Sequence, residues 1–111
     1  MNDFKVFCAD TFSVALLDEM PDMIRVFGSD GRVLFANRAM QARFGPPQKG
    51  SCDKMPGVGR KCPECIVHRC IASRRRYSTI MRGRSRVYTV SACPVPYEGN
   101  VYALEVFTDI T

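Results

Sequence analysis

The most unusual chemistry in this 111-residue sequence is a cluster of cysteines. Four of the six cysteines fall within nineteen residues, at Cys52, Cys62, Cys65 and Cys70. Cys62 and Cys65 have the C-x2-C spacing with which a tight turn brings two thiolates onto one tetrahedral metal ion, each at about 2.3 Å. Cys52, together with Cys70 or His68, would complete a set of four ligands. The spacing therefore indicates a metal site.

The same cysteines have other interpretations. On a regular helix Cys65 and Cys70 lie about 140° apart around the axis, so both bind one metal only if Cys65 precedes the helix. Otherwise Cys70 packs in the core, and the remaining three are reduced thiols or include a disulfide between Cys52 and Cys62. A small thiol oxidoreductase is a further alternative, although no βαβ unit of the thioredoxin kind surrounds the C-x2-C pair.

Basic residues concentrate in the same part of the chain. The formal charge is +5, and the segment 60–86 alone holds nine Lys and Arg against one acid, Glu64. Arg60, Lys61 and Arg69 would lower the pKa values of neighbouring thiols. The segment lacks the interleaved aromatic residues and the motifs of nucleic-acid binders. We therefore expect no nucleic-acid binding, and instead a solvated face or a surface that meets acidic segments of a partner.

Composition limits the class of protein. Apolar residues make up 46% and charged residues 24% of the chain, the usual mix of one globular domain. No apolar run approaches the roughly 20 residues that cross a bilayer, and charged residues interrupt the N-terminus. We expect a cytoplasmic protein or a cytoplasmic piece of one, with no membrane contact in this segment.

Periodicity and turn residues predict the elements. A helix is expected over 10–20, with Phe12, Leu16 and Met20 along one stripe, and a short helix over 38–44 is expected to be capped by Asn37. A third helix is expected over 62–73. The strands are expected over 23–27, 33–36, 77–82, 86–95 and 100–108. This order predicts an α+β fold: a five-stranded antiparallel sheet with short helices on one face and the N-terminal helix on the other.

Two runs of sequence resemble a known family. PDMIRVFGSDGRVLFANRAMQARFG looks like the opening of a PAS domain: strand, Asp-Gly turn, strand, an Asn that starts a short helix, and a Gly. VYTVSACPVPYEGNVYALEVFTDIT is similar to the last hairpin of that family and ends on Asp109-Ile110-Thr111. The resemblance covers about 18–111 and implies a PAS sensor domain, which we place at 21–111. The apolar stripe of the first helix makes 1–20 the expected segment for capping and dimerisation.

The resemblance also implies a function. PAS domains are sensory and dimerisation modules, usually attached to a histidine kinase, a cyclic-dinucleotide enzyme or a transcriptional activator. We expect a non-catalytic homodimer whose output domain lies outside this sequence. A constitutive dimerisation module that senses nothing is the alternative.

Cysteine-bearing PAS domains of bacterial sensors are similar around the cluster, which implies zinc, an iron–sulfur cluster or an oxidant-responsive thiol pair. His68 lies where haem-binding relatives carry an axial ligand. The flavin-binding motif is absent apart from the Cys52 position.

The alternation of side chains along strands predicts two faces for the sheet. Arg25 and Glu105 are expected to point outward. Residues of the opposite parity would lie on an inner face toward the short helices, among them Ile24, Val26, Tyr102, Leu104 and Val106. The PAS resemblance implies a ligand pocket on that face, lined by Ile24, Val26, Leu104 and Val106, and a filled core is the alternative. The remaining apolar residues would form an outer face that needs a cover, either from the stripe of the N-terminal helix or across a dimer: Met23, Phe27, Val101, Ala103 and Phe107.

Overall fold

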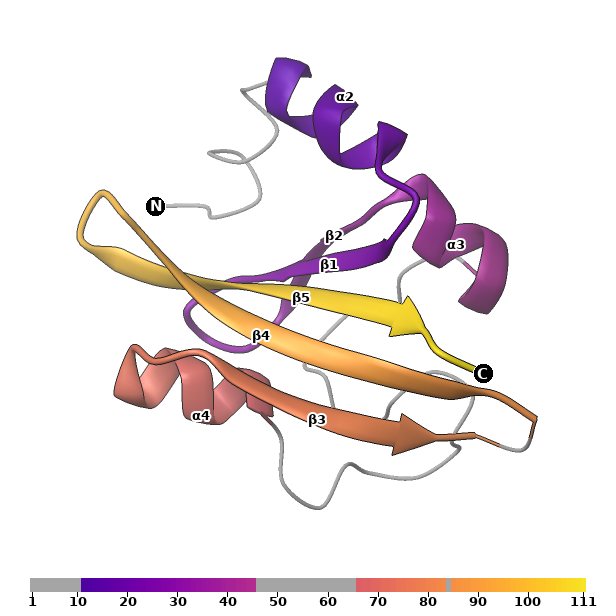
Figure 1. The fold of residues 1–111 in the computed structure, drawn as a ribbon. Coiled ribbons are helices and arrows are strands. Elements are labelled where there is room, and N and C mark those ends of the chain that lie inside the picture. Colours follow the sequence, from indigo (N-terminus) through magenta and orange to yellow (C-terminus); the bar gives the residue numbers. More distant parts are fainter. Residues whose placement is uncertain (1–10, 46–65, 84) are drawn as a thin grey trace.

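Five antiparallel strands form one twisted sheet in the computed structural model, which describes residues 11–45, 66–83 and 85–111 (Figure 1). The strand order is β2-β1-β5-β4-β3, so β1, β5 and β4 are central, and β2 and β3 are the two ends. The strands are β1 (Met23–Phe27), β2 (Val33–Ala36), β3 (Tyr77–Arg82), β4 (Val87–Tyr97) and β5 (Asn100–Asp109). The helices are α2 (Thr11–Glu19), α3 (Arg38–Phe44) and α4 (Ile66–Ser73).

Local sequence explains where the elements begin and end. Asn37 accepts a hydrogen bond from the Met40 amide and so caps α3, and Gly45, at φ +86°, ends it. Glu98 and Gly99, at φ +48° and +80°, form the two-residue turn between β4 and β5. Such a turn matches the right-handed twist of the strands it joins. The cap at Asn37 is the one that the sequence predicted.

β4 ends at Tyr97, two residues beyond its expected end, and it contains Pro94 and Pro96. Prolines interrupt a central strand because they lack an amide hydrogen. Here the first residue of β3, Tyr77, pairs with Ala92, so β4 beyond that point pairs with β5 alone. The prolines therefore break no bond to β3. The predicted first turn of the third helix, 62–65, lies outside the described residues.

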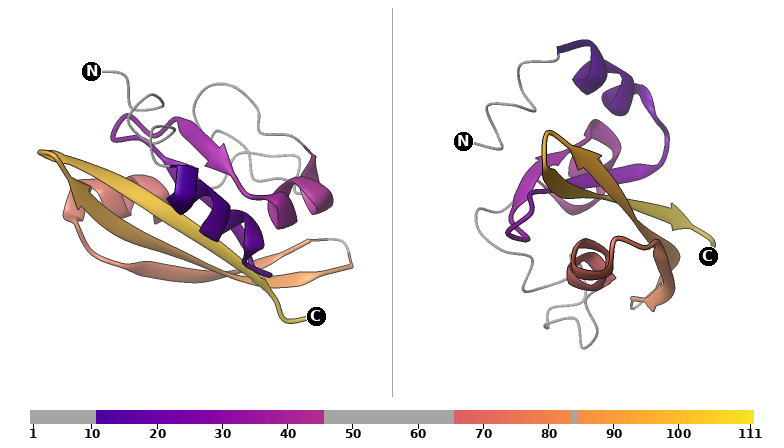
Figure 2. Two further views of the ribbon diagram at one scale, coloured as in Figure 1. Left: turned by 90° about the horizontal axis from the view of Figure 1, so that it is seen from above. Right: turned by 90° about the vertical axis from the view of Figure 1, so that its left-hand side faces the viewer.

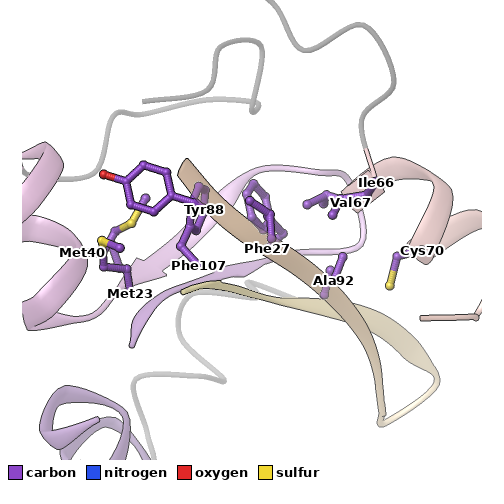
Figure 3. Packing of buried hydrophobic residues seen from close by; sticks show 12 residues of the cluster. Met23, Phe27, Met40, Ile66, Val67, Cys70, Tyr88, Ala92 and Phe107 are labelled. Carbon is purple, nitrogen blue, oxygen red and sulfur yellow. The ribbon is translucent and has the colours of Figure 1, made fainter. Parts of the chain in front are cut away.

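The core fills the space between one face of the sheet and the helices α3 and α4. Met40 of α3 and Ile66, Val67 and Cys70 of α4 pack against side chains of β1, β4 and β5, as Figure 3 shows. Figure 2 shows α2 and α4 on opposite sides of the strands. Among the described residues, no helix is long and apolar enough to cross a membrane.

Candidate functional site

The helix-covered face of the sheet, which we call the inner face, carries a buried ion pair. Arg25 of β1 and Glu105 of β5 are directly paired across the two strands. The Nε atom of Arg25 lies 2.6 Å from Oε1 of Glu105, and the two side chains are 7% and 1% exposed. The guanidinium carbon of Arg25 also lies 5.0 Å and 5.5 Å from the ring centroids of Phe27 and Phe107. The positive charge therefore meets both a carboxylate and two aromatic faces.

This pair reverses the expected assignment of faces. The residues that share the parity of Arg25 and Glu105 belong to the buried core beneath α3 and α4: Met23, Phe27, Ala103 and Phe107. The expectation that these residues point outward is wrong. The prediction treated each charged side chain as solvent-exposed. In the structure each of the two charges compensates the other, so neither needs contact with water.

The four residues expected to line a ligand site lie together, but on the opposite, outer face. Ile24 pairs with Val106, and Val26 pairs with Leu104, on the side of the sheet away from the core cluster. Ile24 and Val26 are buried, whereas Leu104 and Val106 are partly exposed. Only Leu104 and Val106 therefore contribute to the surface of the outer face, and none of the four residues faces α3 or α4.

Asn37 connects α2, β1 and α3 through one fully buried side chain. Its Oδ1 accepts hydrogen bonds from the amides of Ile24 and Met40, both at 3.0 Å. Its Nδ2 donates to the carbonyl oxygens of Leu17, at 2.8 Å, and Asp22, at 2.9 Å. The sequence identified Asn37 as a helix cap, but the bonds to α2 and β1 were not foreseen. They fix the end of α2 relative to the sheet.

The C-terminal Asp109 joins three parts of the chain. Its Oδ2 lies 3.1 Å from Arg43 of α3 and 3.0 Å from Arg86, just before β4. Its Oδ1 accepts hydrogen bonds from the amide and the hydroxyl of Thr111. These Thr111 hydrogen bonds, and then Arg86, lower the pKa of Asp109 from 3.8 to about 2. We call Arg43, Arg86, Asp109 and Thr111 the exit cluster, because they hold the point where the chain leaves β5.

The structure describes one cysteine of the predicted metal cluster. Cys70 is fully buried in the core, and burial, followed by the nearby Cys93, raises the pKa of its thiol. Its thiol is therefore protonated at neutral pH, as expected of a cysteine that packs in the core. Cys52, Cys62 and Cys65 lie outside the described residues, so the cluster itself stays a prediction.

His68 lies on a different side of α4 from Cys70. It is exposed, and its ring lies against Gly31 in the β1–β2 turn, where a Cβ atom would come within 2.6 Å of the imidazole. Two residues apart on a helix, His68 and Cys70 do not point at a common ligand. Within the described ranges, no three His, Cys, Asp or Glu side chains are placed to hold a metal ion.

The stripe on α2 faces away from its own sheet. Phe12, Leu16 and Met20 are 71%, 53% and 41% exposed. The stripe was expected to cover the face of Met23, Phe27 and Phe107, either within the chain or across a dimer. Within the chain, that face is covered by α3 and α4, and the stripe stays exposed. Three large apolar side chains in a row on one helix remain open to a partner.

Comparison with known proteins completes the description. A family model described as the PAS fold matches residues 17–111. The PAS domain of nitrogen regulation protein NR(II) from Vibrio parahaemolyticus is 14% identical, covers 88% of this chain and 97% of its own, and has a TM-score of 0.66. The PAS domain of BvgS from Bordetella pertussis is 21% identical, covers 94% and 88%, and has a TM-score of 0.68.

A sensory box sensor histidine kinase from Vibrio cholerae is 11% identical, covers 100% of this chain and 97% of its own, and has a TM-score of 0.61. At these identities, the solved structures establish the fold alone. No curated protein matches the chain by sequence.

Proposed function

Because the chain belongs to the PAS fold family, we propose that it is a sensory and regulatory module of a signal-transduction protein. The module carries out no reaction itself. It acts on an output domain joined to it in the same polypeptide, such as a histidine kinase, a cyclic-dinucleotide enzyme or a transcriptional activator. Similar solved structures include sensor histidine kinases, which favours the first of these.

The observation that carries this proposal is the exit cluster. Asp109 ties the end of β5 to α3 through Arg43 and to the start of β4 through Arg86. The Ile110 amide also donates to the Val87 carbonyl at 2.8 Å. A change in the packing of α3 or β4 on the inner face therefore moves the residues that lead out of the domain. A signal passes in this way only if it favours one arrangement of the sheet over another.

A domain graft tests this role. The chain replaces the PAS domain of a histidine kinase, joined after Thr111, and autophosphorylation is measured. We expect Asp109→Asn to change the activity of the fusion several-fold, because the substitution removes the charge that both arginines contact. Asp30→Asn makes the same substitution in the exposed β1–β2 turn and serves as the control. Equal activity of the D109N and unsubstituted fusions contradicts the proposal.

We further propose that the module is a homodimer formed through the exposed stripe of α2 and the apolar outer face. Phe12 and Leu16 are more than half exposed, and Leu104 and Val106 of the outer face are partly exposed. Burying such side chains against a second copy contributes about 1.5–3 kcal/mol for each large one that becomes fully buried.

Sedimentation of the full chain at high micromolar concentration tests the dimer. Leu16→Glu is expected to produce a monomer, whereas Ala42→Glu, a matched substitution at an exposed position of α3, is expected to leave the dimer intact. A monomeric unsubstituted chain contradicts this part of the proposal.

We propose that the module senses either redox state, through the thiols of the cysteine cluster, or a metal cofactor bound at that cluster. Its support is the spacing of Cys62 and Cys65 and their neighbouring basic residues. Metal analysis and an absorption spectrum of protein purified without oxygen test it. Stoichiometric zinc, or an iron–sulfur spectrum that disappears in Cys62→Ser, supports a cysteine-based site. A colourless, metal-free protein with no oxidant response contradicts it.

One observation favours a second function, a constitutive dimerisation module. The inner face is filled by the pair of Arg25 and Glu105 and by large side chains that are fully buried, among them Phe27, Phe107 and Met40. A sensor for small molecules needs space that these residues occupy. Such a module would dimerise identically in the oxidised, reduced and metal-treated states, whereas a sensor would not.

A further inference from the structure

The end of the sheet at β3 differs from the rest of the surface in charge. Between Ile66 and Arg86 the chain has seven arginines and no acidic residue. Arg74, Arg75 and Arg76 are consecutive and exposed at the junction of α4 and β3, and Arg82 is exposed at the other end of β3. Among the described residues, no acidic side chain lies within ion-pair distance of these four arginines. Their charge is available to a partner.

The strand between these arginines lies at the end of the sheet and, among the described residues, has one edge without a neighbouring strand. β3 is the last strand of the sheet and pairs only with β4 among the described elements (Figure 1). Its central residues Ser78, Thr79 and Ile80 are all exposed. An end strand presents a row of unpaired backbone amides and carbonyls, which is a template for a further strand. The centre of β3 carries neither a charge nor a proline that would block such pairing.

The backbone at Arg74 gives a second reason to assign a role to the arginines. Arg74 follows the last turn of α4 at φ +60°, a conformation usually occupied by glycine or asparagine at the end of a helix. An arginine is strained there, and its amide still donates to the Cys70 carbonyl at 2.8 Å. A charged residue at a position where glycine fits better points to a use for its side chain.

We propose that the free edge of β3 binds an extended acidic segment of a partner protein, which adds to the sheet as a sixth strand. The backbone of β3 supplies the pairing, as in other cases of strand addition. The arginines at its two ends select a segment that carries carboxylates along its length, the ends included.

Charge and chemistry also argue against two other partners at the edge of β3, a second copy of the chain and a nucleic acid. Pairing of β3 with the β3 of a second copy, in either direction, sets the arginines of one chain beside those of the other, so like charges oppose it. A nucleic acid offers no backbone that continues a sheet. The aromatic ring nearest the arginines, that of Tyr77, is already covered by Arg69, whose guanidinium carbon lies 4.7 Å from the ring centroid.

The test measures binding of a labelled peptide of four Glu-Val repeats to the full chain by fluorescence anisotropy. We expect it to bind more tightly than a Lys-Val peptide of the same length, and binding is expected to weaken with added salt. Arg75→Ser with Arg76→Ser is expected to weaken it roughly fivefold. Arg38→Ser, an exposed arginine of α3, is the control and should leave binding unchanged.

Two variants separate this proposal from unfolding and from charge attraction alone. Arg74→Gly relieves the strained position, so a weaker affinity in a chain of equal or higher melting temperature reports the lost side chain. A Glu-Val peptide with N-methyl groups on alternate residues keeps its charge but cannot pair with a strand, and it is expected to lose binding. Equal binding of the methylated peptide, displacement by a second copy of the chain, or stronger binding of a single-stranded DNA or of anionic lipid vesicles overturns the proposal.

Discussion

The arginines at the two sides of the sheet have opposite environments. Arg25, on β1, is almost wholly buried and lies against Glu105 and two aromatic rings. Arg74, Arg75 and Arg76, beside β3, are exposed and have no acidic partner among the described residues. The β1 side thus uses its polar groups to hold the fold together, whereas the β3 side leaves them for contacts outside the domain.

Breaking the buried pair tests the β1 side most severely. Glu105→Ala leaves the guanidinium of Arg25 buried without its carboxylate, and we expect it to lower the free energy of unfolding by about 3–5 kcal/mol. The double variant Arg25→Met with Glu105→Leu removes both charges and is expected to be more stable than the single variant. Urea unfolding followed by circular dichroism measures both. A single variant as stable as the double variant would mean that Arg25 does not depend on Glu105.

Removing the side-chain amide of Asn37 is expected to have the next largest effect on the free energy of unfolding. Asn37→Ala deprives two buried amides and two carbonyls of their partner, and we expect a loss of about 2–4 kcal/mol in the same measurement. Amide exchange at Ile24 and Met40 should rise as well. Arg38→Ala, at the next residue but exposed, is the control. Unchanged exchange at both amides would contradict the connecting role of Asn37.

At the β3 side, by contrast, we expect a substitution to raise the stability of the fold. Arg74→Gly replaces a residue at φ +60° with one that adopts this conformation freely, so we expect a gain of about 1 kcal/mol in stability. Arg75→Gly, next to it and without positive φ, is the matched control and should not stabilise. A chain destabilised by R74G would show that the Arg74 side chain supports the fold, contrary to its assignment to an outside contact.

The smallest effect on stability is expected at the exit cluster, where the charged side chains are exposed to solvent. The pKa of Asp109 is lowered from 3.8 to about 2, so its carboxylate favours the folded state above about pH 4. This contribution disappears as the pH falls through 2, because protonation then weakens the bonds to Thr111 and Arg86. An NMR titration of the Asp109 carboxyl carbon measures the midpoint, which Thr111→Val should raise. A midpoint near 4 in the unsubstituted chain would remove the electrostatic basis of the cluster.

Much of the fold follows from local sequence. The bounds of β1, β2, β3 and α3 match the prediction because turn residues, a helix cap and a glycine mark each end. The PAS resemblance followed from the order of these same signals and is confirmed by the family match.

The two faces of the sheet were not predictable one residue at a time. Arg25 and Glu105 are 80 residues apart, and either one alone indicates a solvent-exposed position. One signal was present: Arg25 is the single charge of β1, Glu105 is the single charge within the expected strand 100–108, and the two charges have opposite signs. Considered together, they would have suggested a buried pair across two strands. The contacts of Asp109 with Arg43 and Arg86 depend on packing between distant segments in the same way.

Our main hypothesis is that a change in side-chain packing on the inner face alters the positions of Ile110 and Thr111 through Asp109. It is tested most directly by amide chemical shifts at Ile110 and Thr111 when the buried Cys70 is changed to alanine, with and without Asp109→Asn. We expect C70A to shift these two amides in the chain with Asp109 and to shift them much less in the chain with D109N. Equal shifts in both chains, or no shift in either, would contradict it.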